Sequence, residues 1–369
     1  MIGAGPYALS AAAYARARGI RTKIVGRPMA FWRENMPEEM FLRSGPDWHF
    51  DAAEEHTLEA FLAEKGIGQA EVDPLPIGVL LDYAEWFQAS KALAIDERLV
   101  TELTKPNGAF EAVLEDGERV LADAVVAAPG IRHFTNLPQW ADQVPAGRRG
   151  HTCEVVRFDG FADARVLIIG GRQSAYEWAA LFNDHGAARI DVVHRHDVPR
   201  FAKVSWRFCD DYIDHTLAER GWWRNLPASE QEAIGRRFWE VGRLTLEYWL
   251  VPRLHGVHRH PGTEVVEVEQ GGGGVGVRLS NDDRLEADYV VFASGYKANL
   301  ANVPYLHGVV GDIEIAEGCP VLDEAFGTSL PGLYVTGFAG TRDFGPFFGF
   351  TKGVPAAATL MVRQLLSRA

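Results

Sequence analysis

The sequence predicts a mixed α/β fold in which one β–turn–α–β unit occurs twice. Two pairs of matching segments lead to this prediction. In the first pair, a glycine-rich turn precedes a helix-forming stretch, at residues 3–27 and again at 170–195. In the second pair, ERVLADAVVAAPG ends at Gly130 and DRLEADYVVFASG ends at Gly295. Because both pairs recur in the same order at nearly the same separation, we expect one architectural unit to be used twice.

The first unit starts at the very beginning of the sequence. Residues 8–18 favour a helix, and residues 22–25 are expected to form the strand that follows it. Only two residues precede Gly3, whereas a strand of about five residues normally leads into such a turn. We therefore expect the first strand to be truncated and the natural chain to begin earlier.

The second unit is complete in the sequence. The short apolar run at 165–169 suits a buried parallel strand. A turn follows at 170–175, then a helix at 176–185 that Gly186 is placed to end, and then a strand at 190–193.

The remaining segments are assigned more coarsely. Residues 110–126 and 263–291 each show the alternating pattern of a β-hairpin. The segment 198–260 is rich in tryptophan, and its residues 229–250 are expected to form one helix. A further helix is expected at 353–368.

Composition excludes several classes of protein. The 369 residues are 47% hydrophobic and 24% charged, the balance of a soluble globular protein of about two to three domains. The net charge of −13 argues against nucleic-acid or anionic-membrane partners. Three cysteines, none in a C-x-x-C motif, disfavour a dithiol redox centre and fit a reducing cytoplasm. No apolar run is long enough to span a membrane.

The first turn, Gly3-x-Gly5-x-x-Ala8, has the spacing of a dinucleotide-binding motif. The first glycine allows a tight turn, the second lets the backbone approach a pyrophosphate, and the small third residue allows close packing of helix and strand. An acid that would bind the adenosine ribose is expected at the end of the next strand, where this chain has Gly26 and Arg27.

The second turn, at 170–175, places Arg172 where the second glycine would stand. Arg195 ends the following strand, at the position where an arginine accommodates the 2′-phosphate of NADP and an acid would select NAD. The alternative is that Arg195 is an ordinary solvated side chain. His194 and His196 flank it without an acid or thiol at ligand spacing, so no metal site is expected.

Two dinucleotide modules without a thiol pair, a metal motif or a hydrolase motif suggest two cofactors in one chain. Hydride transfer between a nicotinamide and a flavin requires such an arrangement, because the cofactors carry the chemistry. No side chain of the sequence stands out as catalytic.

The sequence resembles the two-dinucleotide-binding flavoproteins at Gly3–Pro6, at 170–175 and at Ala293–Tyr296. Within them it is most similar to the class B flavin monooxygenases, the flavin-containing and N-hydroxylating enzymes. The resemblance implies two Rossmann-like domains, with an NADPH domain inserted into a discontinuous FAD domain. The implied ranges are 1–155 and 293–369 for FAD, and 156–292 for NADPH with a helical insertion at about 198–260.

The group's F-x-G-x-x-x-H-x-x-x-Y/F fingerprint is matched in part. Gly147 and His151 are present, but Pro145 and Val155 replace both aromatic residues. His151 is therefore either part of the fingerprint or a linker residue with a hydrogen-bonding role.

The resemblance also implies the residues that hold each cofactor. For FAD these are Gly3, Gly5, Pro6, Ala8, Trp32, Arg43, Ser44, Gly130, Gly337, Asp343 and Phe344. For NADPH they are Gly170, Gly171, Arg172, Gln173, Ser174, Arg195 and Tyr296. Phe338 stands where related reductases carry the acid that binds the ribityl chain, so either Asp343 substitutes for that acid or the contact is lost. Further aromatic residues near Phe344 are expected to line the flavin or substrate cavity: Phe347, Phe348 and Phe350.

The implied reaction is NADPH-dependent oxygenation of a nitrogen or sulfur of a small molecule by O2, through a C4a-(hydro)peroxyflavin. Two other interpretations stay open: a pyridine-nucleotide reductase without a redox disulfide, and a non-catalytic nucleotide-binding sensor. Substrate and oligomeric state are not legible in the sequence.

Overall fold

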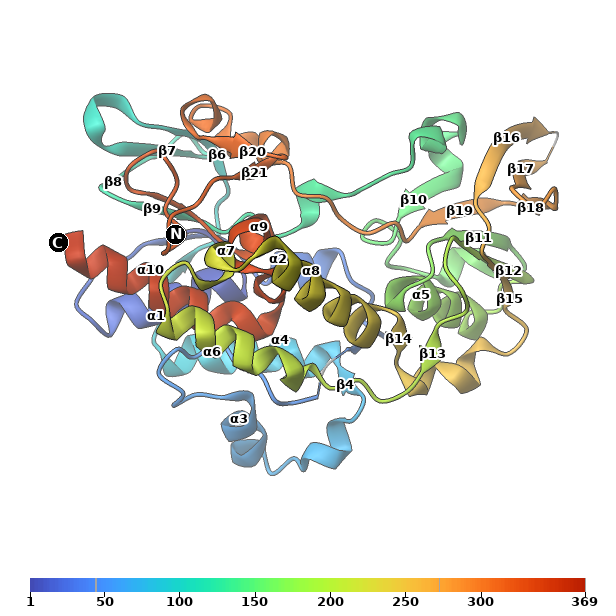
Figure 1. Ribbon diagram of the computed structural model, residues 1–369, viewed down its shortest axis with the longest axis horizontal. Helices are drawn as coiled ribbons and strands as arrows, with labels where there is room; N and C mark the ends of the chain where they lie inside the picture. The colour runs from blue at the N-terminus through green and yellow to red at the C-terminus, as the bar shows by residue number, and fades with distance from the viewer. Residues whose placement is uncertain (44, 272, 369) are drawn as a thin grey trace.

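The computed structural model describes residues 1–43, 45–271 and 273–368, with the side chains of 270 and 271 left out. Two lobes lie side by side, joined by two roughly parallel connections and by a helical segment (Figure 1). Within the described ranges, no helix has the length and apolar character required to cross a membrane.

The first lobe is built on a five-stranded parallel sheet. Its strand order is β22 (Leu333–Val335), β9 (Val125–Ala127), β1 (Ile2–Ala4), β2 (Ile24–Pro28) and β5 (Ile95–Asp96). Strand β1 is short but pairs on both sides, with β2 and β9. Helix α1 (Pro6–Arg16) follows it and packs against α10 (Val354–Arg368) through a nearly continuous alanine surface. Strands from both ends of the chain therefore share one sheet.

The second lobe repeats this plan. Its parallel sheet has the order β10 (Arg149–His151), β19 (Tyr289–Phe292), β11 (Arg165–Ile169), β12 (Arg189–His194) and β15 (His258–Pro261), with helix α5 (Gln173–Asp184) after β11. Strand β10 lies before residue 156, so the chain enters this sheet a few residues earlier than the expected boundary.

Each lobe also carries one three-stranded antiparallel sheet, where the sequence predicts a hairpin. These are β6 (Val100–Thr104), β7 (Phe110–Leu114) and β8 (Arg119–Ala122), and β16 (Val265–Gly271), β17 (Gly274–Leu279) and β18 (Arg284–Ala287). The first lobe further contains α2 (Ala30–Glu34), β3 (Phe41–Leu42), α3 (Leu58–Lys65), β4 (Leu75–Pro76), α4 (Ile77–Ser90), β20 (Ile315–Ala316), β21 (Cys319–Pro320) and α9 (Thr341–Phe344).

The expectation of one helix over 229–250 is wrong. Helix α8 (Ala228–Arg237) continues as a π-helical turn at Phe238–Arg243, and β14 (Thr245–Leu246) and a 3₁₀ segment at Tyr248–Leu254 follow. A side chain at Gly242 would meet the Trp206 ring at 2.8 Å, so tertiary packing fixes this turn. Strand β14 then pairs with β13 (Arg200–Phe201).

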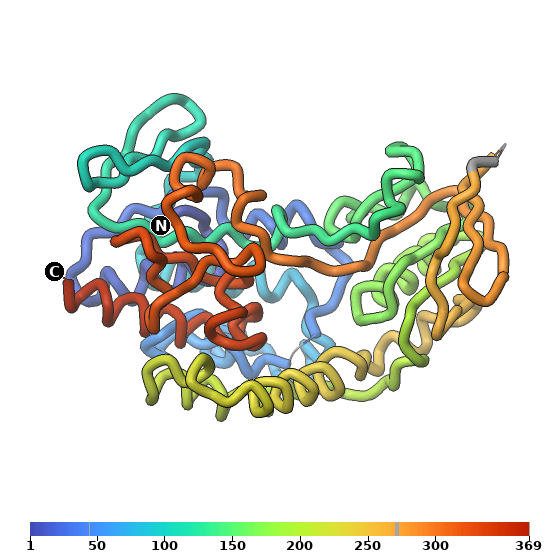
Figure 2. Tube along the Cα trace, turned by 45° about the horizontal axis from the view of Figure 1, so that its top comes forward, coloured from blue at the N-terminus to red at the C-terminus, as the bar shows by residue number. Residues whose placement is uncertain are grey.

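The segment 198–260 reaches back to the first lobe. Its helices α6 (Asp210–Ala218), α7 (Trp222–Asn225) and α8 run along that lobe before the chain returns to the second (Figures 1 and 2). The indole of Trp223 donates to the Arg342 carbonyl at 3.1 Å, and Lys352 pairs with Asp210 at 2.6 Å. The insertion therefore bridges both lobes.

Candidate active site

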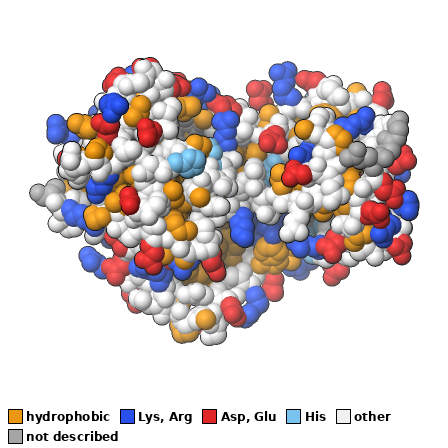
Figure 3. All heavy atoms as spheres, turned by 90° about the horizontal axis from the view of Figure 1, so that it is seen from above, with side chains coloured by type: hydrophobic (Ala, Val, Ile, Leu, Met, Phe, Trp, Pro, Cys, Tyr) orange, Lys and Arg blue, Asp and Glu red, His pale blue; other side chains and the backbone are white. Residues whose placement is uncertain are grey.

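One continuous cleft of about 1870 Å³ lies between the lobes, and both glycine-rich turns line it. Seen from above, the surface is hollowed between the lobes (Figure 3). The cleft receives residues from the first sheet, the second sheet and the insertion. Two ligands, one at each turn, would therefore lie in the same space.

The first turn is held by close backbone contacts. Gly3 has φ +102°, and a Cβ there would lie 2.5 Å from the Ala128 carbonyl oxygen. A Cβ on Gly26, at φ +135°, would lie 3.2 Å from the Gly3 Cα. Gly5 has open space instead, at the N-terminus of α1, with Pro6 in the first turn of the helix. This open cradle of backbone at a helix N-terminus fits a pyrophosphate.

The second turn has the same construction. Gly170 has φ +135°, and a Cβ there would lie 2.4 Å from the Ala293 carbonyl oxygen. Ala128 and Ala293 occupy corresponding places in the two matched segments of the sequence. The repeat seen in the sequence is therefore also a repeated contact in the structure. In each lobe, the glycine turn packs against the backbone carbonyl that follows a neighbouring strand, β9 in the first lobe and β19 in the second.

Most of the expected FAD residues lie on the cleft. Trp32, Arg43, Gly130 and Gly337 line it together with the first turn, while Ala8 is fully buried beneath that turn. Ser44 lies outside the described residues.

Asp343 and Phe344 do not line the cleft. The Asp343 carboxylate is 5% exposed and accepts hydrogen bonds from the Leu322 backbone and the Arg342 guanidinium, both at 2.8 Å. Phe344 stacks on Phe326 at 3.6 Å. The short helix α9 turns both side chains inward, so they pack in the core and not against the cleft.

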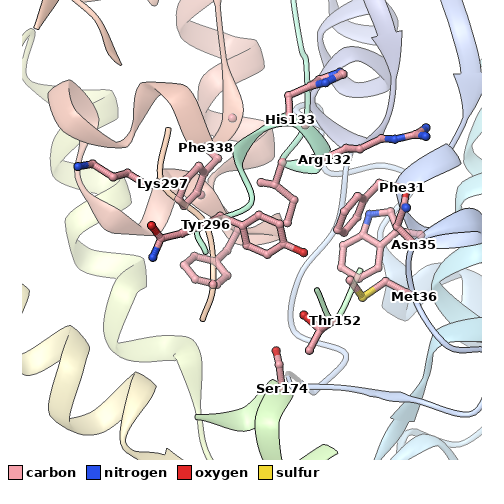
Figure 4. Close-up of a pocket in the computed structure, with 18 of the residues that line it drawn as sticks. Phe31, Asn35, Met36, Arg132, His133, Thr152, Ser174, Tyr296, Lys297 and Phe338 are labelled. Carbon is pink, nitrogen blue, oxygen red and sulfur yellow. The ribbon is translucent and has the colours of Figure 1, made fainter. Parts of the chain in front are cut away.

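Aromatic side chains surround the centre of the cleft. Tyr296 lies 6.3 Å from Phe31, ring to ring, and 5.0 Å from His151. Figure 4 shows the Tyr296 ring between Phe338 and the α2 segment that carries Phe31, with Ser174 of the second lobe nearby. Tyr296 was expected at NADPH, and it stands where the two lobes meet. Phe347 and Phe350 also line the cleft, but Phe348 does not.

His151 serves as a linker residue that bonds within the protein. It is 1% exposed, with Nε2 3.1 Å from the Gly295 carbonyl and Nδ1 3.2 Å from the Cys153 sulfur. Because a carbonyl can only accept, Nε2 carries the proton and Nδ1 accepts. Burial lowers the pKa of His151, which keeps the ring neutral. The ring thereby ties the two connections between the lobes together.

Guanidinium groups line the second-lobe side of the cleft. Arg172 precedes α5 and lies 3.8 Å over the Trp239 ring, while Arg195 follows β12 and is exposed. Arg243, from the π-helical turn, also faces the cleft. Sequence reasoning missed Arg243 and Trp239, since nothing in a helical pattern marks a turn that bends towards a distant site.

The comparisons with known proteins identify the family. The model of the pyridine nucleotide-disulphide oxidoreductase family matches residues 1–238 and 244–344. The chain belongs to this family. Two similar curated members are an FAD-dependent urate hydroxylase of Xanthomonas campestris and a ferredoxin–NADP reductase of Gluconacetobacter diazotrophicus. The urate hydroxylase is 33% identical, over 36% of this chain and 30% of its own length. The ferredoxin–NADP reductase is 30% identical, over 65% of this chain and 60% of its own length. The chain thus matches less than two thirds of the length of either relative.

Solved structures share the fold over nearly the whole chain. An ornithine N-hydroxylase of Kutzneria sp. 744 superposes with a TM-score of 0.79 at 15% identity, covering 100% of this chain and 98% of that one. A flavin-containing monooxygenase of Stenotrophomonas maltophilia gives 0.71 at 20% identity, covering 100% and 97%. The resemblance to N-hydroxylating and flavin-containing monooxygenases is therefore confirmed for the fold.

The thiols of this family member are not arranged as a pair. All three cysteines are free, and of the three only Cys209 lines the cleft. Burial raises the pKa of the Cys209 thiol to about 12, which leaves it protonated and unreactive at neutral pH.

Two buried glutamates stand behind the second turn. Glu177 on α5 is 1% exposed and accepts from Gln173 at 3.1 Å, and Arg253 lies 3.6 Å away. Glu247 is 2% exposed, accepts from the Val204 backbone at 3.3 Å and lies 3.9 Å from the Arg43 guanidinium. The side-chain amide oxygen of Gln173 accepts from the Glu247 backbone N–H at 3.1 Å, so Gln173 contacts both glutamates. Burial raises the pKa of Glu247 to about 7.

We expect Glu247 to make stability fall as the pH rises. Its folded-state pKa of about 7 exceeds the ordinary value of 4.5, so between these values the folded chain holds a proton that the unfolded chain has released. The wild-type chain should lose about 2 kcal/mol more unfolding free energy between pH 5 and pH 8 than Glu247→Gln does. Denaturant titrations of both proteins measure this, and identical pH slopes would contradict it.

Proposed function

We propose that this chain is an FAD-dependent, NADPH-using monooxygenase that oxygenates a nitrogen or sulfur of a small molecule, with O2 as cosubstrate. The observation that carries the proposal is the pair of equivalent glycine turns on one cleft, which would let a nicotinamide and a flavin approach each other. The similarity in fold to an ornithine N-hydroxylase and a flavin-containing monooxygenase supports it. A cytoplasmic location is part of the same proposal.

The residues present fit FAD at the first turn. The Gly5 cradle and the N-terminus of α1 would hold its pyrophosphate, and Gly130, Gly337 and Trp32 would border the rest. When bound, the flavin supplies the redox chemistry with oxygen. The chain's own task is to hold the cofactor and to exclude water from the cleft.

The residues also fit NADPH at the second turn. The N-terminus of α5 would meet the pyrophosphate, with Gly170, Gln173 and Ser174 at the turn. Arg172 and Arg195 would supply positive charge to the phosphates.

The insertion is suited to shielding the reaction from solvent. Trp206 stacks on Phe350 at 5.3 Å and lies 5.4 Å from Phe238, so aromatic rings from the insertion and the C-terminal loop form one wall. We call Trp206, Phe238 and Phe350 the aromatic wall. It gives this side of the cleft an apolar surface.

The second candidate is a reductase that passes electrons to an external acceptor. The similarity to ferredoxin–NADP reductases favours it. The ferredoxin–NADP reductase of Symbiobacterium thermophilum is 26% identical over 91% of this chain and 83% of its own length. The absence of a thiol pair from the cleft does not separate the two candidates.

The absorption spectrum of the purified protein tests the proposal. Released cofactor should run as FAD in chromatography, since FMN lacks the pyrophosphate that the first turn fits. Anaerobic NADPH should bleach the flavin, and oxygen should then yield an oxygenated amine or sulfide. Reduction of an added acceptor without any oxygenated product would favour the reductase, and no reduction by NADPH would favour a sensor.

Arg195 is expected to select NADPH over NADH. Arg195→Ala should raise the NADPH dissociation constant by about 10-fold, because one charge-assisted contact to the 2′-phosphate is lost. NADH affinity should stay unchanged, as should both affinities in Arg200→Ala, an exposed arginine outside the cleft. Equal losses for both nucleotides would show that Arg195 acts on the fold or the pyrophosphate instead.

A further inference from the structure

The cleft has the opposite charge to the rest of the chain. The sequence carries a net charge of −13, yet eight Lys and Arg side chains line the cleft against three Glu. Of these glutamates, Glu115 and Glu264 are exposed, and Glu177 already faces Arg253. A cleft lined by one sign of charge concentrates ligands of the other sign. Its ligands are therefore anions.

Four of these cations form a row from one lobe to the other. Arg43 comes from the first lobe, Arg243 from the insertion, and Arg172 and Arg195 from the second lobe. Burial lowers the pKa of both Arg43 and Arg172, and neighbouring cations lower it further: Arg243 acts on Arg43, and Arg243 and Arg195 act on Arg172. Glu247 beside Arg43 is the one acid paired with this row in the described part of the chain.

The four arginines of this row have different contacts. Arg172 and Arg195 stand at the second turn, where the phosphates of a dinucleotide would lie. Arg43 is engaged in docking the insertion, since its guanidinium donates to the Thr245 carbonyl and lies 3.9 Å from Glu247. This leaves Arg243 as the member of the row that neither the turn nor the docking contact uses.

Arg243 is surrounded by rings. Its guanidinium carbon lies 5.0 Å from the Phe350 centroid and 5.4 Å from that of Phe238. Among the described residues, the Arg243 guanidinium has no hydrogen-bond partner and no ion-pair partner. The rings of the aromatic wall fix the position of the guanidinium, and its N–H groups remain available to a ligand. A guanidinium fork presented this way matches a carboxylate in two parallel hydrogen bonds.

We propose that Arg243 binds the carboxylate of an organic-acid substrate whose apolar part lies along the aromatic wall. The inference rests on the proposed function and narrows it to substrates that carry an anionic group beside the nitrogen or sulfur. An amine without a carboxylate would bring its positive charge next to the Arg243 guanidinium, with no negative group to compensate it. A phosphate of NADPH is the other anion that Arg243 could reach, so the experiment separates the two.

The test measures binding without turnover. Calorimetry on the FAD-loaded full chain, saturated with NADP+, gives dissociation constants for three matched thioethers: (phenylthio)acetate, (phenylthio)acetamide and 2-(phenylthio)ethylamine. The wild-type protein should bind the acid at least ~10-fold more tightly than the amide, and the amine most weakly. Arg243→Gln should abolish the preference for the acid, whereas Arg243→Lys should keep part of it.

Arg236→Gln is the matched control, because Arg236 lies on the same insertion but is 67% exposed and outside the cleft. It should bind all three thioethers as the wild type does. Equal affinity of the wild type for acid and amide, or no measurable binding of the acid, overturns the proposal. So does a 10-fold weaker NADP+ affinity in Arg243→Gln with an unchanged preference for the acid, which would assign Arg243 to the nucleotide.

These binding constants do not depend on oxygenation. If NADPH reduces the flavin but no sulfoxide forms from any thioether, the proposed monooxygenase function fails, while the preference for the acid still decides the role of Arg243.

Discussion

Gly170→Ala is expected to raise the NADPH dissociation constant at least ~100-fold while FAD stays bound. At φ +135° an alanine is strained, and its Cβ would lie 2.4 Å from the Ala293 carbonyl oxygen and 2.9 Å from the carbonyl carbon. Both atoms are backbone of the crossing segment after β19, so no side chain can move aside. The turn must shift, and with it the N-terminus of α5 and its donors.

The Cβ would lie at 2.4 Å, whereas ordinary van der Waals contact begins at 3.4 Å, so the turn and its pyrophosphate donors must move. A displacement of ~1 Å at a binding site can cost about 100-fold. About 2.7 kcal/mol of lost binding free energy corresponds to the expected 100-fold change. Anaerobic titration of the flavin with NADPH measures it. In the proposed monooxygenase, the same variant should also release a larger fraction of its turnovers as hydrogen peroxide, because displaced nicotinamide no longer shields the flavin.

Gly160→Ala provides the control, since a Cβ at this exposed position meets nothing within 4 Å. NADPH affinity within ~3-fold of the wild type in Gly170→Ala would show that the turn does not hold the nucleotide. Loss of FAD from Gly170→Ala would show instead that the two lobes do not bind their cofactors separately.

The glycine turns were predictable because the constraint on them is local. A tight turn that rests on a neighbouring strand leaves no space for a Cβ, and this requirement appears directly as Gly3 and Gly170 in the sequence. The alternation of the hairpins and the alanine surface of α1 are local signals as well. The sequence therefore identified both units and their order.

The errors arise where distant parts of the chain decide the outcome. Residues 229–250 have helical propensity, but Gly242 packs beneath Trp206 and the helix gives way to a π-helical turn. Asp343 was considered as a substitute for the acid that Phe338 replaces, but distant packing places its carboxylate in the core, where it accepts from the Leu322 backbone. Arg243 faces the cleft only because the insertion folds back across both lobes, which no short motif encodes.

Arg253→Met is expected to lower the free energy of unfolding by about 3 kcal/mol at pH 8. Glu177 is almost completely buried, and Arg253 is the cation beside it, at 3.6 Å. Removing one partner of a buried ion pair leaves the other charge without compensation, which costs more than the pair itself contributes. Burial already raises the pKa of Glu177, and the loss of Arg253 would raise it further.

The pH dependence distinguishes this cause from a loss of packing. Because the folded-state pKa of Glu177 lies above its unfolded value, the carboxyl of the variant takes up a proton more readily in the folded chain as the pH falls. The cost of Arg253→Met should therefore be smaller at pH 5 than at pH 8. Urea titrations followed by tryptophan fluorescence at both pH values measure the difference.

Two further variants make the interpretation specific. Adding Glu177→Gln to Arg253→Met removes the uncompensated charge and should restore most of the lost stability at pH 8, since the amide oxygen can still accept from the Phe41 backbone. Asp184→Asn removes the other partner of Arg253, whose side chain is 42% exposed, and should cost less than about 1 kcal/mol. An equal cost at both pH values, without recovery in the double variant, would mean that Arg253 supports the fold through its contacts with α5 and not through its charge on Glu177.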